Sequence, residues 1–398
     1  MLFRSYVPAS PAGGPAGQRR GAGGYVIYMN QGTLFAVRFD LDRLETIGQA
    51  VPVFDGIASS SAVTGGAQFA VGPDGTLVYS PGGSGSVTVP IDWITHDGRT
   101  SALRAAPANW NNPRFSPDGQ KLAFEIFDGK QWDIWVHDLA RDTTTQLTFE
   151  ASDDRAAVWT PDGKRIAFTS NRATGGVYNV YWMNADGTGD VTRLTDSPKS
   201  VRPSSWHPSG KFLAFYSVDL RDIRILPMEG DATRGWTPGT PTAFLPTPAS
   251  EGAPMFSPDG RWIAYTQPDG AGTRDTYVRA FPGPGGPWRI STTSGSFPRW
   301  SASSNELLFL KYLDPSPSKI MAARYTVVGN SFRAETPYVW SPTSVDRISI
   351  YNDPYDLHPD GRRIAAAAVP DEAGVIRDQV VFVFNFADHV STLLPAAK

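Results

Sequence analysis

The distribution of apolar residues along the chain predicts short β-strands joined by tight turns. Within residues 113–124, Phe115 ends one apolar run, Pro117–Gly119 interrupts it with Pro-Asp-Gly, and Leu122–Phe124 begins the next run. Proline favours the first central position of a type I turn, aspartate hydrogen-bonds to its own backbone, and glycine adopts the left-handed conformation that completes a three-residue loop. The segment is therefore predicted to be a β-hairpin.

The same hairpin pattern recurs along the whole chain. Its turn prolines are residues 73, 117, 161, 208, 258 and 359, and Ala302 stands at the proline position of one more copy, giving intervals of 44, 44, 47, 50, 44 and 57 residues. This period, with four short strands in each unit, is typical of propeller blades. Equivalent positions hold Phe115, Trp159, Trp206, Phe256 and Trp300, which we expect to form a ring between blades.

The predicted fold is therefore all-β, a β-propeller of four-stranded antiparallel blades. Seven blades are favoured, and six or eight remain open. Residues 1–24, rich in Gly, Ala, Pro and Arg, are predicted to be a disordered leader or linker. Residues 25–398 are assigned to the propeller, with 25–65 as a partial N-terminal blade unit and 66–398 as seven hairpin-bearing units. The last unit is expected to place its third and fourth strands at 379–384 and 391–394.

Composition excludes several classes of protein. There is no cysteine, so disulfides, cysteine-ligated zinc and thiol catalysis are excluded, and the net charge of −3 gives no reason to expect nucleic acid as a partner. No segment approaches the roughly 18 consecutive apolar residues of a membrane span. Met1 to Gly24 lacks the apolar core of a signal peptide, and we expect the chain to be the C-terminal part of a longer protein.

The residues that could carry chemistry are better explained as parts of turns. His207 and His358 precede turn prolines, and His96, His137 and His389 stand alone without a second ligand at metal spacing, so no metal and no cofactor is expected. Because Asp118, Asp162, Asp259 and Asp360 recur once in each blade, they are predicted to form turns. No Gly-x-Ser-x-Gly elbow is present, and hydrolase activity is not expected.

The remaining candidates are unrepeated residues in the segments that enter the innermost strands. These segments should gather at one mouth of a central channel, where mixed charges and aromatic residues suit a peptide, a partner loop or a polar small ligand, although a solvated rim is the alternative. The candidate binding residues are Trp110, Asn111, Arg114, Asp154, Arg155, Arg202, Glu251, Arg299, Tyr351 and Asp353. The long segment from Gly329 to Asp353 is predicted to be a lid or docking element.

The Ser-Pro-Asp-Gly-x-x-Ile/Leu-Ala-Phe hairpin, followed by Asp-Ile-Trp-Val and Leu-Thr strands, resembles the WD40-like repeat of TolB-type propellers over roughly residues 66–394. Five blocks also resemble the C-terminal propeller region of bacterial membrane-anchored serine/threonine protein kinases: 32–40 together with 51–53, 133–138, 179–182, 278–286 and 380–385. In those proteins the propeller follows a kinase domain and usually a membrane helix. The resemblance implies a signalling module outside the cytoplasm, tethered through an upstream segment. This chain has no glycine-rich phosphate loop, His-Arg-Asp or Asp-Phe-Gly, so no kinase activity is carried over.

The leading hypothesis is a non-enzymatic propeller that binds a protein or ligand, as the sensory or scaffolding part of a kinase-type receptor. One alternative is a TolB-like periplasmic protein of envelope assembly. Another is the substrate-gating propeller of a prolyl-oligopeptidase-like peptidase whose catalytic domain is absent.

Overall fold

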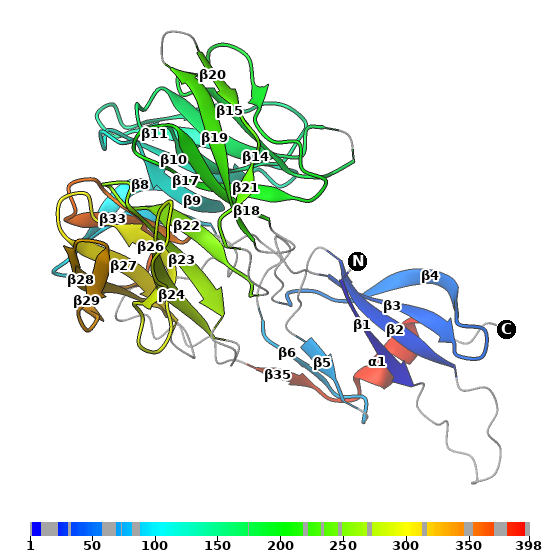
Figure 1. Ribbon diagram of the computed structural model, residues 1–398. Coiled ribbons are helices and arrows are strands. Elements are labelled where there is room, and N and C mark those ends of the chain that lie inside the picture. The colour runs from blue at the N-terminus through cyan, green and yellow to red at the C-terminus, as the bar shows by residue number, and fades with distance from the viewer. Residues whose placement is uncertain are drawn as a thin grey trace. The chain divides into compact units, whose positions relative to one another are not determined.

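The computed structural model describes residues 2–8, 23–30, 33–57, 69–72, 74–81, 88–173, 175–217, 222–231, 235–245, 249–268, 273–312, 317–345, 353–369 and 380–394. Two compact units make up the chain (Figure 1). The smaller unit consists of Met1–Val87 and Ala373–Lys398, and the larger unit of Thr88–Glu372. The single propeller predicted over residues 25–398 is thus divided between two units.

The described residues of the smaller unit form two antiparallel sheets and one helix. Its four-stranded sheet follows chain order: β1 (Leu2–Pro8), β2 (Gly23–Asn30), β3 (Thr33–Asp40) and β4 (Glu45–Phe54). Its three-stranded sheet has the order β35 (Val381–Val383), β6 (Leu77–Tyr79) and β5 (Phe69–Val71). The partial unit predicted at 25–65 therefore gains a strand from residues 2–8, which the leader prediction had treated as disordered; residues 9–22 lie outside the described part of the chain.

The C-terminal segment differs from the expected pair of strands. β35 pairs with β6 rather than with the last hairpin, and residues predicted as the fourth strand lie in helix α1 (Phe386–Leu393). Phe386, Ala387 and Val390 are spaced for one helical face, and they are buried against apolar residues of both sheets. The helical spacing of these apolar residues thus outweighs the β-propensity of the short Ser391–Leu394 run.

The described residues of the larger unit form six sheets of four or more strands, and each sheet is named by its innermost strand. The β9 blade has β9 (Trp110–Phe115), β10 (Lys121–Phe127), β11 (Trp132–Asp138) and β12 (Thr143–Gln146). The β13 blade has β13 (Asp154–Trp159), β14 (Arg165–Ser170), β15 (Asn179–Asn184) and β16 (Thr192–Arg193). The β17 blade has β17 (Val201–Trp206), β18 (Phe212–Ser217), β19 (Ile223–Asp231), β20 (Gly235–Pro238) and β21 (Thr242–Ala243).

The remaining three blades follow the same plan. The β22 blade has β22 (Gly252–Phe256), β23 (Trp262–Pro268), β24 (Arg274–Ala280) and β25 (Trp288–Arg289). The β26 blade has β26 (Ser296–Trp300), β27 (Glu306–Lys311), β28 (Lys319–Val328), β29 (Ser331–Ala334) and β30 (Tyr338–Val339). The β32 blade has β32 (Tyr355–Leu357), β33 (Arg363–Ala366), β7 (Val89–Thr95) and β8 (Thr100–Ala108), and β31 (Ser344–Val345) pairs with β34 (Ala368–Val369).

The six blades form a closed ring. Each inner strand lies beside the inner strand of the next blade, and β32 lies beside β9. The β32 blade joins the two ends of the larger unit, because β33 pairs with β7 from Ala366↔Asp92 to Arg363↔Thr95. Seven blades are therefore not found in the described residues: the hairpin at Pro73 belongs to the smaller unit, and β7 and β8 complete the blade begun by the last hairpin.

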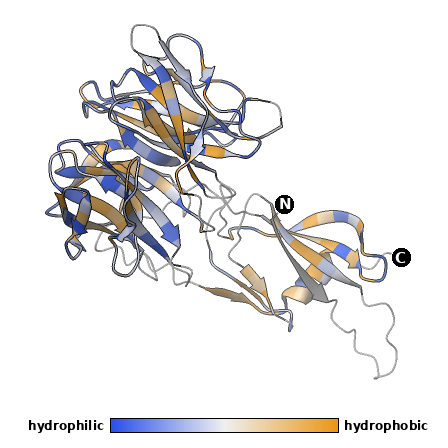
Figure 2. Ribbon diagram, viewed as in Figure 1, coloured by the Kyte–Doolittle hydropathy of each residue, from blue (hydrophilic) through white to orange (hydrophobic). Residues whose placement is uncertain are grey.

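Burial decreases from the axis of the ring to its rim. Every described residue of β9 and of β26 is buried, whereas the outer strands β12 and β16 carry only exposed or half-buried residues. Figure 2 shows the apolar residues concentrated along the strands and the polar residues in the connections. Because both faces of each blade carry apolar side chains, each blade is stabilised by its neighbours.

The turn prediction is confirmed for the regular hairpins. The turn glycines have φ between 67° and 73°: Gly119, Gly163, Gly210, Gly260 and Gly361. Asp118 accepts hydrogen bonds from Ser116 Oγ at 2.5 Å and from the Gln120 N–H at 3.0 Å, as expected for a turn former.

The irregular hairpin of the β26 blade forms its turn differently. Ser304 stands where the regular hairpins have their turn glycine, but it is not among the described residues with positive φ. Instead, Ser301 Oγ accepts hydrogen bonds from the N–H groups of Ser303 at 3.3 Å and Ser304 at 3.2 Å. A serine hydroxyl thus holds the turn that glycine holds elsewhere.

The predicted lid segment is partly built into the propeller. Residues 331–334 and 338–339 form β29 and β30, which pair with β28, and Phe332 and Trp340 are buried. Residues 331–339 of this segment therefore belong to the β26 blade, whereas β31 pairs with β34, and residues 346–352 lie outside the described part of the chain.

Candidate functional site

Six inner strands surround the axis of the larger unit. A large side chain stands immediately before each turn and is only 6–8% exposed: Phe115, Trp159, Trp206, Phe256, Trp300 and Leu357. The indole N–H groups fasten neighbouring blades, because Trp159 Nε1 donates to the Arg114 carbonyl at 3.0 Å and Trp300 Nε1 to the Met255 carbonyl at 2.9 Å. The predicted ring of aromatic residues is confirmed.

Five inner strands contain a bulge near the position three residues before the ring residue, and in four of them a residue with positive φ stands at that position. The non-glycine residues there have positive φ: Asn112 (52°), Ala156 (56°), Ala253 (50°) and Phe297 (55°). Such a conformation costs roughly 1–2 kcal/mol, and contacts to the preceding blade offset it. The Ala156 N–H donates to Glu125 Oε2 at 2.7 Å, and the Phe297 N–H donates to Thr266 Oγ1 at 3.3 Å. These bulges re-aim the side chains that follow them.

An axial cavity of about 330 Å³ lies at the turn end of the inner strands, and all six blades contribute to it. The residues immediately before the ring residues line it: Arg114, Val158, Ser205, Met255, Arg299 and Asp356. The ring residues complete its walls. The axial cavity therefore combines apolar walls with a small number of charged groups, as ligand sites commonly do.

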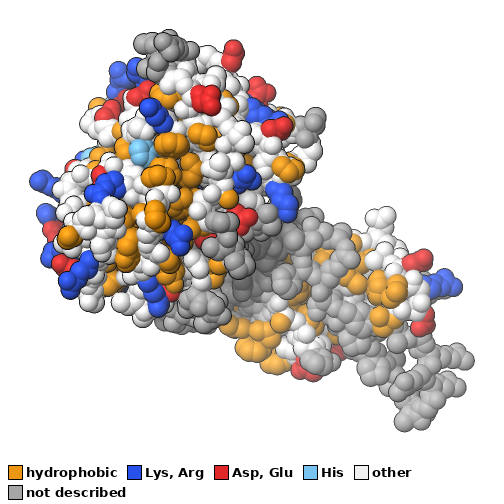
Figure 3. Space-filling model, viewed as in Figure 1, with side chains coloured by type: hydrophobic (Ala, Val, Ile, Leu, Met, Phe, Trp, Pro, Cys, Tyr) orange, Lys and Arg blue, Asp and Glu red, His pale blue; other side chains and the backbone are white. Residues whose placement is uncertain are grey.

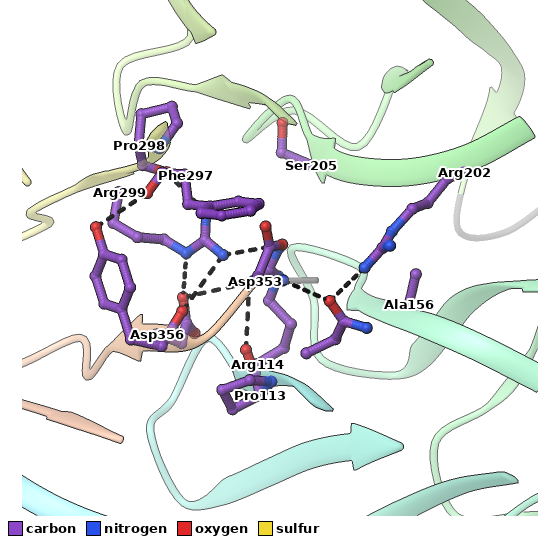
Figure 4. A network of polar contacts seen from close by, with 12 residues as sticks. Pro113, Arg114, Ala156, Arg202, Ser205, Phe297, Pro298, Arg299, Asp353 and Asp356 are labelled. Atoms are coloured by element: carbon purple, nitrogen blue, oxygen red, sulfur yellow. Dashed lines mark hydrogen bonds and ion pairs between the residues drawn. The ribbon is translucent and has the colours of Figure 1, made fainter. Parts of the chain in front are cut away.

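The charged residues of the axial cavity belong to one ion network, which consists of Arg114, Arg299, Asp353 and Asp356 (Figure 4). Arg114 pairs with Asp353, and Arg299 lies 3.1 Å from Asp353 through Nη2 and 2.8 Å from Asp356 Oδ1 through Nε. Asp356 Oδ2 also accepts the Phe115 N–H at 2.8 Å. The network thus joins the β9, β26 and β32 blades across the axis.

Asn112 extends this network toward Arg202 of the β17 blade. Asn112 Oδ1 accepts hydrogen bonds from the Asp353 N–H at 2.8 Å and from Arg202 Nη2 (Figure 4). Burial opposes ionisation of Asp353, but the guanidinium groups of Arg114, Arg299 and Arg202 outweigh it and hold the pKa of Asp353 well below its usual range. Asp353 is therefore an anion throughout the physiological pH range.

Formal charge is balanced within the ion network. Two guanidinium groups (Arg114 and Arg299) face two carboxylates (Asp353 and Asp356), and Arg202 approaches the network through Asn112. Arg114 Nε has no hydrogen-bond partner among the described residues. Arg114 and Arg299 line the axial cavity, and their guanidinium groups suit a ligand group that accepts hydrogen bonds, such as a carbonyl or a carboxylate.

Of the ten predicted site residues, four come together in this way: Arg114, Arg202, Arg299 and Asp353. Arg155 instead pairs with Glu125 at 3.0 Å, and Asp154 pairs with Arg172 at 2.9 Å. Both carboxylates are fully buried and present no charge to the solvent: the Glu125–Arg155 pair joins the β9 and β13 blades, and the Asp154–Arg172 pair lies within the β13 blade.

The other predicted residues serve the core or are not described. Trp110 is fully buried and its indole donates to the Val89 carbonyl at 3.1 Å. Asn111 and Glu251 are also buried. The sequence placed these residues where the chain enters an inner strand, which predicted that they lie at the open mouth of the channel. It gave no sign that these positions are buried. Tyr351 lies outside the described residues.

Three further residues lie at the axis and were not predicted from the sequence: Asn112, Ser205 and Asp356. Ser205 and Asp356 could have been found, because they stand at the same repeat position as Arg114 and Arg299, immediately before the ring residue. Asn112 depends on the bulge, which no residue type marks consistently across the blades.

Other groups at the axis are engaged in structural hydrogen bonds. Ser205 Oγ donates to the Pro254 carbonyl at 2.9 Å and accepts the Phe256 N–H at 3.0 Å, which ties the β17 blade to the β22 blade. Among the residues that the structure describes, no group of three or more His, Cys, Asp or Glu is placed to hold a metal ion. No described helix is long and apolar enough to cross a membrane.

Comparisons with known proteins agree with this architecture. Residues 70–240 match the family model of the TolB β-propeller domain. The solved structure of a putative TolB from Agrobacterium tumefaciens superposes with a TM-score of 0.53 and 18% identity, covering 71% of this chain and 99% of that chain. The fold is that of a TolB-type β-propeller. TolB from Acinetobacter baumannii gives a TM-score of 0.46 at 15% identity over 86% of this chain and 78% of that chain.

A curated relative adds sequence similarity but no function. An uncharacterized protein of Agrobacterium fabrum is 25% identical over 169 residues, which is 40% of this chain. The match spans 55% of the length of that relative.

Proposed function

We propose that the larger unit is a non-enzymatic β-propeller that binds an extended segment of a partner protein in the axial cavity. The observation that carries this proposal is that all six blades contribute residues to one cavity of about 330 Å³ with apolar walls and two arginines, Arg114 and Arg299. Apolar walls suit side chains, and the arginines suit peptide carbonyl or carboxylate groups. The fold itself is compatible with many functions, so the site and not the fold supports the proposal.

The test fills the cavity without touching the ion network. Met255 is half-buried and lines the axial cavity, so Met255→Trp adds bulk there, whereas Val328→Trp adds the same side chain at a position 78% exposed on β28. Immobilised wild-type protein and both variants are incubated with an extract of the source cells, and the captured proteins are compared by mass spectrometry. A partner retained by wild type and Val328→Trp but lost by Met255→Trp supports the proposal. A partner retained equally by all three overturns it.

We further propose that this propeller is the sensory or scaffolding part of a bacterial serine/threonine kinase-type receptor and acts outside the cytoplasm. The support is the resemblance of five blocks to the propeller regions of such receptors: 32–40 together with 51–53, 133–138, 179–182, 278–286 and 380–385. Sequencing of the genomic DNA upstream of the coding region tests this: an in-frame kinase domain supports the receptor role.

The alternative is a TolB-like role in envelope assembly. Its support is that this chain superposes on nearly the whole of a putative TolB. A coding region that begins with a signal peptide and contains no kinase domain would support that role and contradict the receptor.

A further inference from the structure

A second cavity, of about 310 Å³, lies between the β13 and β17 blades. We call it the tryptophan groove, and its principal lining residues are Pro161, Arg165, Trp182, Trp206, Pro208 and Trp236. Pro161, Trp206 and Pro208 also line the axial cavity. The tryptophan groove therefore continues from the axial cavity over the boundary between two blades.

The aromatic rings of the groove are held in place by the blades. Trp182 and Trp206 are stacked with ring centroids 6.1 Å apart and an interplanar angle of 22°, and the Arg165 guanidinium lies 4.4 Å from the centre of the Trp182 ring. Trp236 on β20 is half-buried and packs against the cluster that contains both of these rings. Figure 3 shows hydrophobic side chains gathered in a band across the visible face of the larger unit.

Trp206 differs from the other ring tryptophans in one respect. Trp159 and Trp300 donate their indole N–H groups to carbonyls of the preceding blade, but Trp206 Nε1 has no hydrogen-bond partner among the described residues. A buried donor without a partner costs about 1–3 kcal/mol. The nitrogen is covered by neighbouring atoms, so a small rotation of the indole is needed for it to meet a carbonyl in the groove.

The polar hydroxyl groups of the groove are already engaged in turns. Thr160 Oγ1 donates to Asp162 at 2.6 Å, and Ser209 Oγ lies 2.7 Å from His207 Nδ1. What the groove offers a ligand is therefore apolar ring surface, one guanidinium group, one indole donor and the Asp162 carboxylate, whose Oδ1 is engaged in its own turn. It lacks the array of free polar groups that a sugar ring would require.

A polyproline II segment has the matching chemistry. Proline rings are apolar and pack against aromatic side chains, and the backbone carbonyls of this conformation make no internal hydrogen bonds. Such segments dock in aromatic-lined grooves and lose little conformational entropy, because proline fixes their backbone beforehand. Arg165 and Trp206 would donate to these carbonyls while Trp182, Trp206 and Trp236 contact the rings.

We propose that the tryptophan groove binds a proline-rich segment of a partner protein in the polyproline II conformation. This inference rests on the proposed binding function, since the groove is continuous with the axial cavity. It adds the class of segment recognised and the two blades that recognise it.

The test uses decaproline as the probe and a glycine–serine peptide of the same length as the control. Binding is measured by isothermal titration calorimetry with the full chain and by the indole N–H signals in ¹⁵N correlation spectra. Wild type is expected to bind decaproline, with a shift of the Trp206 signal, and not the glycine–serine peptide. Trp236→Ala is expected to weaken binding about tenfold or more, as for removal of an aromatic anchor, whereas Trp236→Phe retains most of it.

Trp288→Ala is the matched control, because Trp288 is also a half-buried tryptophan on an outer strand, β25 of the β22 blade. It is expected to bind decaproline like wild type. Absence of decaproline binding by folded wild type overturns this inference and leaves the partner capture at the axial cavity to be judged on its own. Binding that is equally weakened by Trp236→Ala and Trp288→Ala, or unaffected by both, also overturns it.

Discussion

The turn glycine Gly119 is in contact with a side chain of the neighbouring blade, and this contact gives a sharp test of the ring closure. His358, from the β32 blade, places Nε2 3.1 Å from the Gly119 carbonyl oxygen. A Cβ atom added at Gly119 would lie 2.5 Å from this nitrogen and 3.0 Å from Cε1 of the same ring. Gly210 has a similar φ of 73°, but an added Cβ atom there meets nothing within 4 Å. Gly119→Ala and Gly210→Ala therefore form a matched pair.

Both substitutions force alanine into a left-handed conformation, which costs roughly 1–2 kcal/mol in each case. Only Gly119→Ala must also displace His358. That ring is buried between Trp93 and Phe115, with centroid distances of 5.5 Å and 5.0 Å. Overpacking typically costs about 1–3 kcal/mol, and loss of the hydrogen bond adds about 1 kcal/mol. We expect Gly119→Ala to be less stable than Gly210→Ala by about 2–4 kcal/mol.

Urea unfolding followed by tryptophan fluorescence measures the difference, with the free energy of unfolding obtained by linear extrapolation. A double-mutant cycle then isolates the clash. His358→Ser places at this position the residue found at Ser116 and Ser257 in the sibling hairpins, and it removes the ring. In that background Gly119→Ala should cost no more than Gly210→Ala costs in wild type.

Equal destabilisation by the two glycine substitutions would refute the contact between the β32 and β9 blades. So would a cost for Gly119→Ala that is the same with and without His358. An altered denaturant slope in one variant would show that the unfolded states differ, and the comparison would then be repeated at the melting temperature.

Three further predictions concern hydrogen bonds and charge. Asp353→Asn should destabilise the protein by about 3–5 kcal/mol. Because the native pKa of Asp353 is lowered, the contribution of this carboxylate to stability is complete above about pH 4 and is lost as pH falls further. Urea unfolding at neutral and acidic pH should therefore show that the free energy of unfolding falls less for the variant than for wild type. Thr148→Val removes the hydroxyl that donates to Asp133 at 3.1 Å and should cost about 1–3 kcal/mol, whereas exposed Thr145→Val should change the free energy of unfolding by no more than about 0.5 kcal/mol. Burial lowers the pKa of His207, so the contribution of the neutral imidazole to stability is present above about pH 6.5 and is lost as pH falls. Between neutral pH and about pH 5, the melting temperature of His207→Ser should therefore fall less than that of wild type. An equal fall would contradict the buried position of this side chain.

The hairpins and the aromatic ring could be predicted from the sequence because their information is local. Proline, aspartate and glycine at fixed positions specify each turn, and the residue before the turn specifies a buried position. Blade number could not be predicted in the same way, since it depends on which distant strands pair. The hairpin at Pro73 and the strand at Val381–Val383 each look like parts of regular blades, but they pair with one another in the smaller unit.

The candidate site shows the same division between local and non-local information. Arg114 and Arg299 could be predicted as axial residues because they hold equivalent positions in their repeats. Their partner Asp353 could be named as a candidate, but its ion pairs depend on the closing of the β32 blade beside β9. Trp110, Asp154 and Glu251 look like surface residues in the sequence because nothing local reveals the bulges and the buried pairs around them.

The sheet that joins β33 to β7 has a consequence for the kinetics of folding. Its ladder brings residues 363–366 to residues 92–95, so the ring closes through contacts between segments that are far apart along the chain. Loop-closure entropy makes such contacts slow to form. We therefore expect individual blades to assemble first and the β32 blade last. The same sheet should make opening of the ring the slow step of unfolding. The lifetime of the folded propeller would then depend on the strand pairing between the two ends of the larger unit.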